Sequence, residues 1–137
     1  MKAIVNGNIL VGGAFRQGQA LLFTDRIVGY SDSVPEGAEV FDAGGGYVSA
    51  GMIDVHCHGF DGREAGDGGA DDLLSMSRKL VRSGVTAWLP TVSCLAWERY
   101  AEVFAQVALA RQSSFAEGFA GARILGAHAE GPFLSAQ

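Results

Sequence analysis

The stretch GMIDVHCHGFDG, residues 51–62, decides the fold of the larger part of this chain. An apolar run ends in two histidines one residue apart, followed directly by glycine. Because alternate residues of a strand share a face, we expect His56 and His58 to lie together with Asp54, while Cys57 points the other way into the core. The spacing favours a chelate for one divalent ion. Histidines also occur in this spacing on surface strands that bind no metal, and the pair alone leaves both interpretations open.

The pattern after residue 51 alternates between strand-like and helix-like segments, which predicts βα units and a parallel sheet. The expected strands are MIDVHCH (52–58), VTAWLPTVS (85–93) and ARILGAHAEG (122–131); the expected helices are ADDLLSMSRKLVRSG (70–84) and LAWERYAEVFAQVALARQ (95–112). The first helix has acidic residues in its first turn and basic residues later, and Gly84 is a typical C-terminal stop. The sequence therefore predicts an α/β fold for residues 51–137.

The first part of the chain, residues 1–50, consists of short β-type runs separated by turn residues. Asn6 and Gly7 form the dipeptide that is most typical of a two-residue hairpin turn. Gly44 begins a run of three glycines that indicates another turn. We therefore expect a small β unit over residues 1–50.

The third histidine repeats the pattern of the first two. His128 and Glu130 are again two residues apart at the end of an expected strand and before a glycine. Neighbouring strands are ~5 Å apart, so inward side chains from the first and third strands can bridge to one or two metal ions. Glu130 is then a metal ligand beside the histidines, or else a solvated carboxylate. His128 is more simply a residue that hydrogen-bonds a neighbour or orients Glu130.

Several other polar residues lie near the expected site. Asp54 is one step deeper than His56, where a carboxylate needs a metal or histidine partner to offset its burial, so we expect it to support the site without binding the metal. The glycine-rich segment GFDGREAGDGGADD (59–72) predicts a mobile loop above the site. Its Asp61 and Asp67 either contact the substrate or are simply solvated.

The composition indicates a folded protein and excludes several partners. Of the 137 residues, 48% are apolar and 18% charged, and the net charge is −5. The ten Lys and Arg residues are scattered, so we expect neither nucleic acid nor a membrane surface as a partner. No apolar stretch approaches the ~20 residues of a membrane span. Cys57 and Cys94 lack the spacing of a disulfide framework and are expected to be buried thiols, which fits the cytoplasm.

Three stretches resemble a known family: VFDAGGGYVSAGMIDVHCHG (40–59), SGVTAWLPT (83–91) and ILGAHAEGPFLS (124–135). They resemble the metal-dependent amidohydrolase superfamily and, more narrowly, its N-acetylglucosamine-6-phosphate deacetylase family, from about residue 40 to the end. The resemblance implies a (β/α)8 barrel with a divalent metal, zinc or iron. It implies Glu130 as the principal metal ligand and His56 and His58 as ligands of a second ion. The implied substrate is an amino-sugar phosphate that loses acetate.

The resemblance also implies that much of the enzyme is missing from these 137 residues. A (β/α)8 barrel takes ~250 residues, so three of its strands fit here, after a partial β-sandwich. The catalytic aspartate and two further histidines of the family are expected beyond the chain. We therefore expect a truncated product or fragment, inactive alone toward N-acetylglucosamine 6-phosphate, or a chain that survives by pairing as a homo-oligomer.

Two alternatives remain open at this point. The His-x-His motif is shared with other amidohydrolases, such as dihydropyrimidinase-like or adenine-deaminase-like enzymes, although HAEGPF (128–133) is not typical of those branches. The chain is otherwise a non-catalytic oligomeric remnant or metal-binding module derived from the enzyme. A weak or absent affinity for divalent ions would favour the second alternative.

Overall fold

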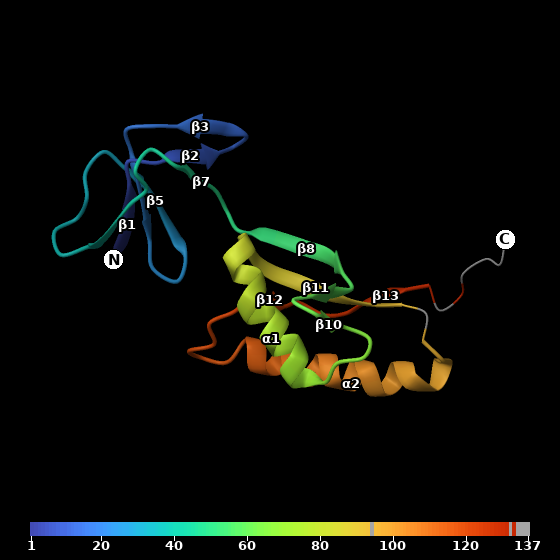
Figure 1. Cartoon of the computed structure of the whole chain (residues 1–137). Coiled ribbons are helices and arrows are strands. Elements are labelled where there is room, and N and C mark those ends of the chain that lie inside the picture. Colours follow the sequence, from blue (N-terminus) through green and yellow to red (C-terminus); the bar gives the residue numbers. More distant parts are fainter. Residues whose placement is uncertain (94, 132, 134–137) are drawn as a thin grey trace. The chain divides into compact units, whose positions relative to one another are not determined.

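A computed structural model describes residues 1–93, 95–131 and 133 of the chain (Figure 1). The chain separates into two compact units, one formed by residues 1–50 and the other beginning at Gly51. The first unit contains only strands, whereas the second combines strands with two α-helices. The chain is therefore a mixed α/β protein.

The N-terminal unit contains two small sheets. Its strands are β1 (Lys2–Val5), β2 (Asn8–Val11), β3 (Ala14–Arg16), β4 (Ala20–Phe23), β5 (Ile27–Ser31), β6 (Glu39–Asp42) and β7 (Tyr47–Val48). One sheet has the order β5-β4-β1-β6 and the other has the order β3-β2-β7. The glycine turn predicted at Gly44 is confirmed: it connects β6 to β7, and Gly44 and Gly45 both have positive φ.

The hairpin predicted at Asn6 and Gly7 is wrong. The two residues do form a turn, with Asn6 at a φ of 54°, but they connect β1 to β2, which belong to different sheets. A β1–β2 hairpin does not form because β1 pairs instead with β4 and β6. β2 makes its own hairpin with β3 through Gly12 and Gly13. The Asn-Gly dipeptide thus marked the turn correctly but not the strand pairing, which is decided by distant partners.

The second unit is built around one long strand. Its elements are β8 (Met52–Cys57), β9 (Gly59–Phe60), β10 (Arg63–Glu64), α1 (Ala70–Leu80), the 3-10 turn η1 (Val81–Ser83), β11 (Val85–Ser93), α2 (Trp97–Ser114), β12 (Arg123–Ile124) and β13 (His128–Glu130). β11 pairs in parallel with β8 on one side and with β12 and β13 on the other. The predicted parallel sheet and both helices are confirmed, and the third expected strand is divided into β12 and β13.

Local sequence explains where the first helix ends. α1 has Asp71 and Asp72 in its first turn and Arg78 and Lys79 in its last, an order that complements the helix dipole. Gly84 then adopts a φ of 82°, a left-handed conformation that glycine reaches without steric cost. This turn directs the chain straight into β11.

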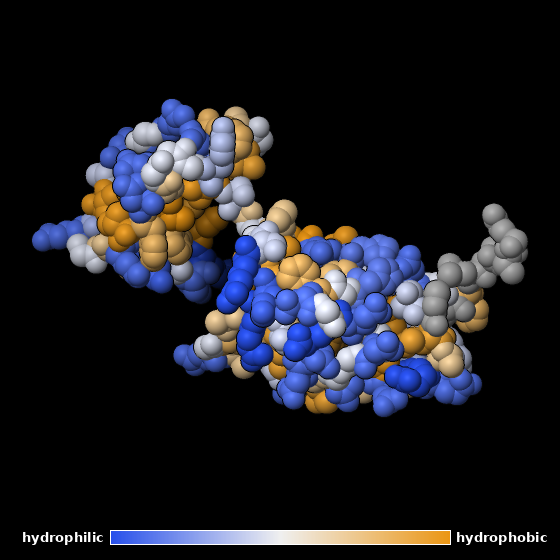
Figure 2. Space-filling model, in the orientation of Figure 1, coloured by the Kyte–Doolittle hydropathy of each residue, from blue (hydrophilic) through white to orange (hydrophobic). Residues whose placement is uncertain are grey.

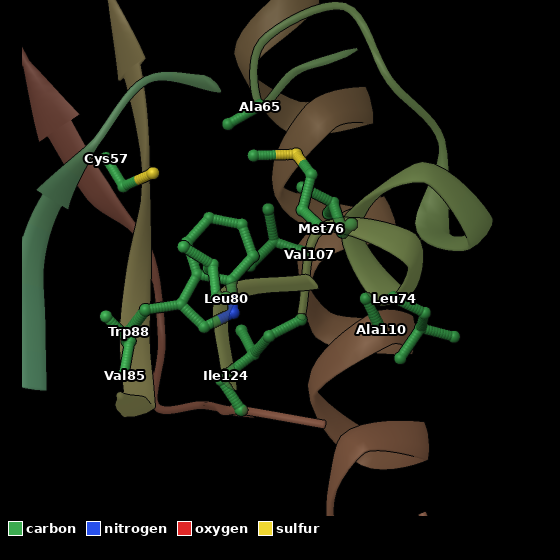
Figure 3. Close-up of a cluster of buried hydrophobic side chains, with 12 residues drawn as sticks. Cys57, Ala65, Leu74, Met76, Leu80, Val85, Trp88, Val107, Ala110 and Ile124 are labelled. Atoms are coloured by element: carbon green, nitrogen blue, oxygen red, sulfur yellow. The ribbon is translucent and has the colours of Figure 1, made fainter. Parts of the chain in front are cut away.

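The core of the second unit lies between the sheet and the two helices (Figure 3). Trp88 of β11 is fully buried there, and its indole Nε1 donates a hydrogen bond of 2.8 Å to Ser77 Oγ on α1. Cys57 is buried in the same cluster, as expected from its position between the two histidines. The core therefore holds β8 through Cys57 and β11 through Trp88.

Apolar side chains also remain on the surface of both units (Figure 2). Among the described residues, β8 pairs only with β11, and its Met52, Ile53 and Val55 are each more than half exposed. In the N-terminal unit, Phe15, Ile27 and Tyr47 are similarly exposed. No helix among the described residues is long and apolar enough to cross a membrane.

Candidate metal centre

The parallel sheet brings together the C-terminal ends of two strands that are distant in sequence. His58 follows directly on β8, and Glu130 is the last residue of β13. β11 lies between these strands, pairing Pro90 with Cys57 on one side and Ser93 with Glu130 on the other. Because both neighbours run parallel to β11, their C-terminal ends meet at one edge of the sheet, where ligand sites of α/β folds gather.

His56, His58 and Glu130 form a tight cluster at this edge. The Nε2 atoms of the two imidazoles lie 3.1 Å apart. Oε2 of Glu130 lies 3.2 Å from Nε2 of His56 and 2.8 Å from Nε2 of His58. Each side chain retains between 39% and 49% of its accessible surface, so the cluster is open to solvent.

The donor set and its geometry fit a divalent metal ion. A tetrahedral ion with bonds of about 2.0–2.1 Å separates its ligand atoms by about 3.3 Å, close to the three distances observed here. A single hydrogen-bonding proton lies between two atoms, so it cannot account for all three short distances. A cation equidistant from the two nitrogens and the oxygen can bind all three atoms at once. Imidazole and carboxylate together suit zinc, iron and similar ions.

His128 lies beside this cluster and bonds in another direction. Its Nδ1 is 3.2 Å from Oγ1 of Thr91, the residue that faces it across the β11–β13 ladder. Its ring packs edge-on against the ring of His56, with centroids 4.7 Å apart. His128 thus packs against the ring of His56, and it does not belong to the group of three converging ligands.

Two hydroxyl side chains of β11 contact the histidines, and sequence reasoning missed both. Thr91 contacts His128, and Oγ of Ser93 lies 3.4 Å from Nδ1 of His58. The available signal was their alternation at the end of an otherwise apolar strand, which places both on one face. Their partners could not be read from the sequence, because they come from β8 and β13.

Asp54 bonds to the backbone of the same strand. Its Oδ1 accepts a hydrogen bond of 3.0 Å from the backbone N–H of His56. The β8–β11 register shifts between the pairs Asp54–Trp88 and Cys57–Pro90, so strict alternation does not extend from Cys57 back to Asp54. Burial raises the pKa of the Cys57 thiol, and the charge of Asp54 raises it further.

The segment expected to be a mobile loop contains a short hairpin. β9 pairs with β10, and a Cβ on Gly59 would lie only 2.4 Å from the carbonyl oxygen of Arg63, so the pairing needs glycine. Asp61 forms ion pairs with Arg63 and Lys79 at 3.6 and 3.2 Å. Asp67 is exposed, and neither aspartate joins the three-ligand group. Cys94, the other predicted buried thiol, lies outside the described residues.

Curated relatives with significant similarity carry one name. N-acetylglucosamine-6-phosphate deacetylase of Vibrio furnissii is 38% identical over 85 residues, covering 62% of this chain and 20% of that protein. The Bos taurus protein of the same name is 30% identical over 127 residues, covering 90% of this chain and 28% of that protein. The chain therefore spans less than a third of the length of these relatives. No family model matches it.

Solved structures that resemble this chain include a deacetylase of the same name and a hydantoinase. A crystal structure of N-acetylglucosamine-6-phosphate deacetylase from Pasteurella multocida superposes with a TM-score of 0.85 at 28% identity, covering 98% of this chain and 35% of that one. A D-hydantoinase from Bacillus sp. AR9 superposes with a TM-score of 0.58 at 26% identity, covering 80% of this chain and 24% of that one. The similarity to the first structure thus extends over almost all of this chain.

Proposed function

From the confirmed resemblance of this chain to N-acetylglucosamine-6-phosphate deacetylases, we propose that it carries part of the metal centre of such an enzyme. The complete enzyme would hydrolyse the acetamide of N-acetylglucosamine 6-phosphate to glucosamine 6-phosphate and acetate in the cytoplasm. One observation carries the proposal: three potential ligand atoms, on His56, His58 and Glu130, converge at the C-terminal edge of the parallel sheet.

The geometry suggests a role for the metal ion and for each of the three ligand residues. When bound, a divalent ion, zinc or iron, would activate water and polarise the amide carbonyl. His56 and His58 would hold the ion through their Nε2 atoms, and Glu130 would add a negative charge through Oε2, which lies close to both. The rigid β11 between them would keep these groups in place, because its side chains are largely buried.

The proton-transfer group and the phosphate-binding residues are not assigned to this chain. In the proposal they come from the remainder of the enzyme, since the chain spans 20% of the Vibrio relative and 35% of the Pasteurella structure. A polypeptide of these 137 residues alone should then release no acetate from N-acetylglucosamine 6-phosphate. Release of acetate by these 137 residues, if it depended on Glu130, would contradict the proposal that the remaining catalytic groups lie elsewhere in the enzyme.

The hydantoinase-like alternative has weaker support. The TM-score of the hydantoinase is 0.58, whereas that of the deacetylase is 0.85. The hydantoinase match also covers less of this chain, 80% compared with 98%. The non-catalytic alternative predicts weak or absent binding of divalent ions, so a measured metal affinity separates it from the two enzyme alternatives.

A chimera tests the proposed activity directly. Residues 1–137 would replace the matching part of the Pasteurella multocida deacetylase, whose structure this chain superposes on over 98% of its length. We expect the chimera to release acetate from N-acetylglucosamine 6-phosphate and to lose this activity in the variant Glu130→Gln. The variant Glu117→Gln is the matched control, because Glu117 is exposed and lies outside the three-ligand group.

The same chimera can also contradict the proposed deacetylase activity. A chimera that elutes and melts like the parent enzyme but releases no acetate would refute the deacetylase proposal. Cleavage of a dihydropyrimidine in place of the amino-sugar phosphate would favour the hydantoinase-like alternative.

We also propose that the chain self-associates as a homo-oligomer. The support is the exposed apolar surface of β8, formed by Met52, Ile53 and Val55 on a strand with one described partner. An unpaired apolar strand edge favours association with a further strand. Sedimentation of the purified chain across a concentration series should show a species larger than a monomer, and a single monomeric species would contradict the proposal.

A further inference from the structure

β11 presents two hydroxyl groups to histidines at this edge of the sheet, one of which belongs to the three-ligand group. Thr91 contacts His128 on the β13 side, and Ser93 contacts His58 on the β8 side. Val92 between them faces the opposite way into the α2 core and is fully buried. The end of β11 is therefore anchored by packing, and its hydroxyls are presented from a fixed backbone.

The two ring nitrogens of His58 point at different partners. Nε2 lies 2.8 Å from Oε2 of Glu130 and 3.1 Å from Nε2 of His56. Nδ1 lies 3.4 Å from Oγ of Ser93. A neutral imidazole that gives the lone pair of Nε2 to a metal carries its proton on Nδ1, and that N–H then needs an acceptor.

We infer that Ser93 is a positioning residue for His58, an inference that rests on the metal centre proposed above. Oγ of Ser93 accepts the Nδ1 proton of His58 and so holds the ring with Nε2 toward the metal position. Partners of this kind fix both the tautomer and the ring orientation of metal-bound histidines.

The location of His58 explains why it needs such a partner. His58 follows the last residue of β8 and precedes Gly59, and its side chain is 44% exposed. Packing alone therefore covers only part of its side chain. Ser93 is paired with Glu130 in the β11–β13 ladder, so its backbone helps to place the Glu130 carboxylate. Its hydroxyl contacts the imidazole of His58, so the same residue influences both ligands.

Cobalt(II) titration of the 137-residue chain tests this inference, because cobalt reports both affinity and ligand environment. We expect the variant Ser93→Ala to bind Co²⁺ about 10- to 100-fold more weakly than the unmodified chain. The variant Ser93→Thr keeps the hydroxyl and should restore the affinity. The control Thr86→Ala removes an exposed hydroxyl near the start of the same strand, which bonds the carbonyl oxygen of Met52 at the far end of β8 from His58, and should leave the Co²⁺ affinity unchanged.

A second readout follows the Nδ1 proton itself. In the Co²⁺-loaded chain this proton should give a strongly shifted, exchange-protected NMR signal for His58, which Ser93→Ala loses to solvent exchange and Ser93→Thr retains. The corresponding signal of His56 serves as the internal reference. The measurement on the unmodified chain is decisive even if Ser93→Ala does not fold, because an unprotected His58 proton would by itself overturn the inference.

The outcomes separate this inference from the proposed function. Absence of Co²⁺ binding by the unmodified chain would refute the metal centre and the inference together. Tight binding that is the same in Ser93→Ala, with an unchanged His58 signal, would refute the positioning role and leave the metal centre intact.

Discussion

Nε2 of His56 lies 3.2 Å from Oε2 of Glu130, although 74 positions separate the two residues in the sequence. β11 produces this contact by pairing with β8 on one side and β13 on the other. The same arrangement places His58 within 2.8 Å of Glu130. A single central strand thus brings together two segments that are far apart in the sequence, and these segments form the candidate site.

The variant Glu130→Gln should weaken Zn²⁺ binding by the chain by more than about 100-fold, above the range seen when only a supporting residue is removed. The substitution keeps the shape of the side chain but removes the negative charge closest to both imidazoles. Competition with a chromophoric chelator measures the affinity. An affinity equal to that of the exposed control Glu117→Gln would show that Glu130 is not a ligand.

The variant Thr91→Val should destabilise the fold by about 1 kcal/mol, because a hydroxyl that bonds the imidazole of His128 is replaced by a methyl group. Thr91 is 1% exposed, so water does not replace the lost partner. Urea unfolding measures the change. Thr86→Val is the comparison, since Thr86 is exposed on the same strand and water can replace its hydrogen bond of 3.4 Å to the carbonyl oxygen of Met52. Equal stability of both variants would contradict the role of the Thr91 contact.

Cys57 should react slowly with iodoacetamide at pH 8 compared with the unfolded chain. Burial, followed by the charge of Asp54, raises the pKa of its thiol, and the thiolate is the reactive form. A Cys94→Ser background isolates the signal, which mass spectrometry can follow over time. Rapid modification of the folded chain would mean that the thiol faces the solvent and not the core.

Acid should weaken the turn that follows β6. The backbone N–H of Gly44, followed by the amide of Asn6, lowers the pKa of the Asp42 carboxyl below 3.8. Because the folded pKa is depressed, the stabilisation is present above the unfolded pKa and is lost as the pH falls through the folded value. An NMR titration of the Asp42 carboxyl should give a midpoint below that of an aspartate in an unstructured peptide, and the variant Asn6→Ala should raise it. An unshifted midpoint would contradict the contact.

The long elements of the second unit were predictable because each carries a strong local signal, whereas the short β9–β10 hairpin was not predicted. β11 occupies residues 85–93 as its apolar run predicts, and α1 ends before Gly84 as its caps predict. The N-terminal unit was less predictable, since its turns are marked by Asn6 and Gly44 but its strand order depends on contacts between distant runs. Local propensity gives no information about such partners.

The candidate site was likewise predictable only in part. Residues His56, His58 and Glu130 were found from spacing at strand ends, because a strand places alternate residues on one face. The contacts of Thr91 and Ser93 were missed, since a hydroxyl in a strand has no distinctive pattern until its neighbour is known. The bond from Asp54 to the His56 backbone was also hidden, because the irregular β8–β11 register interrupts simple alternation.

The metal content of the purified 137-residue chain tests the central claim most directly. After incubation with Zn²⁺ and removal of excess ion, elemental analysis should find bound zinc, and X-ray absorption should show imidazole ligands at about 2.0–2.1 Å. The double variant His56→Ala, His58→Ala should lose this zinc while keeping its circular dichroism spectrum. No saturable zinc in the unmodified chain, or equal zinc in the double variant, would contradict the account.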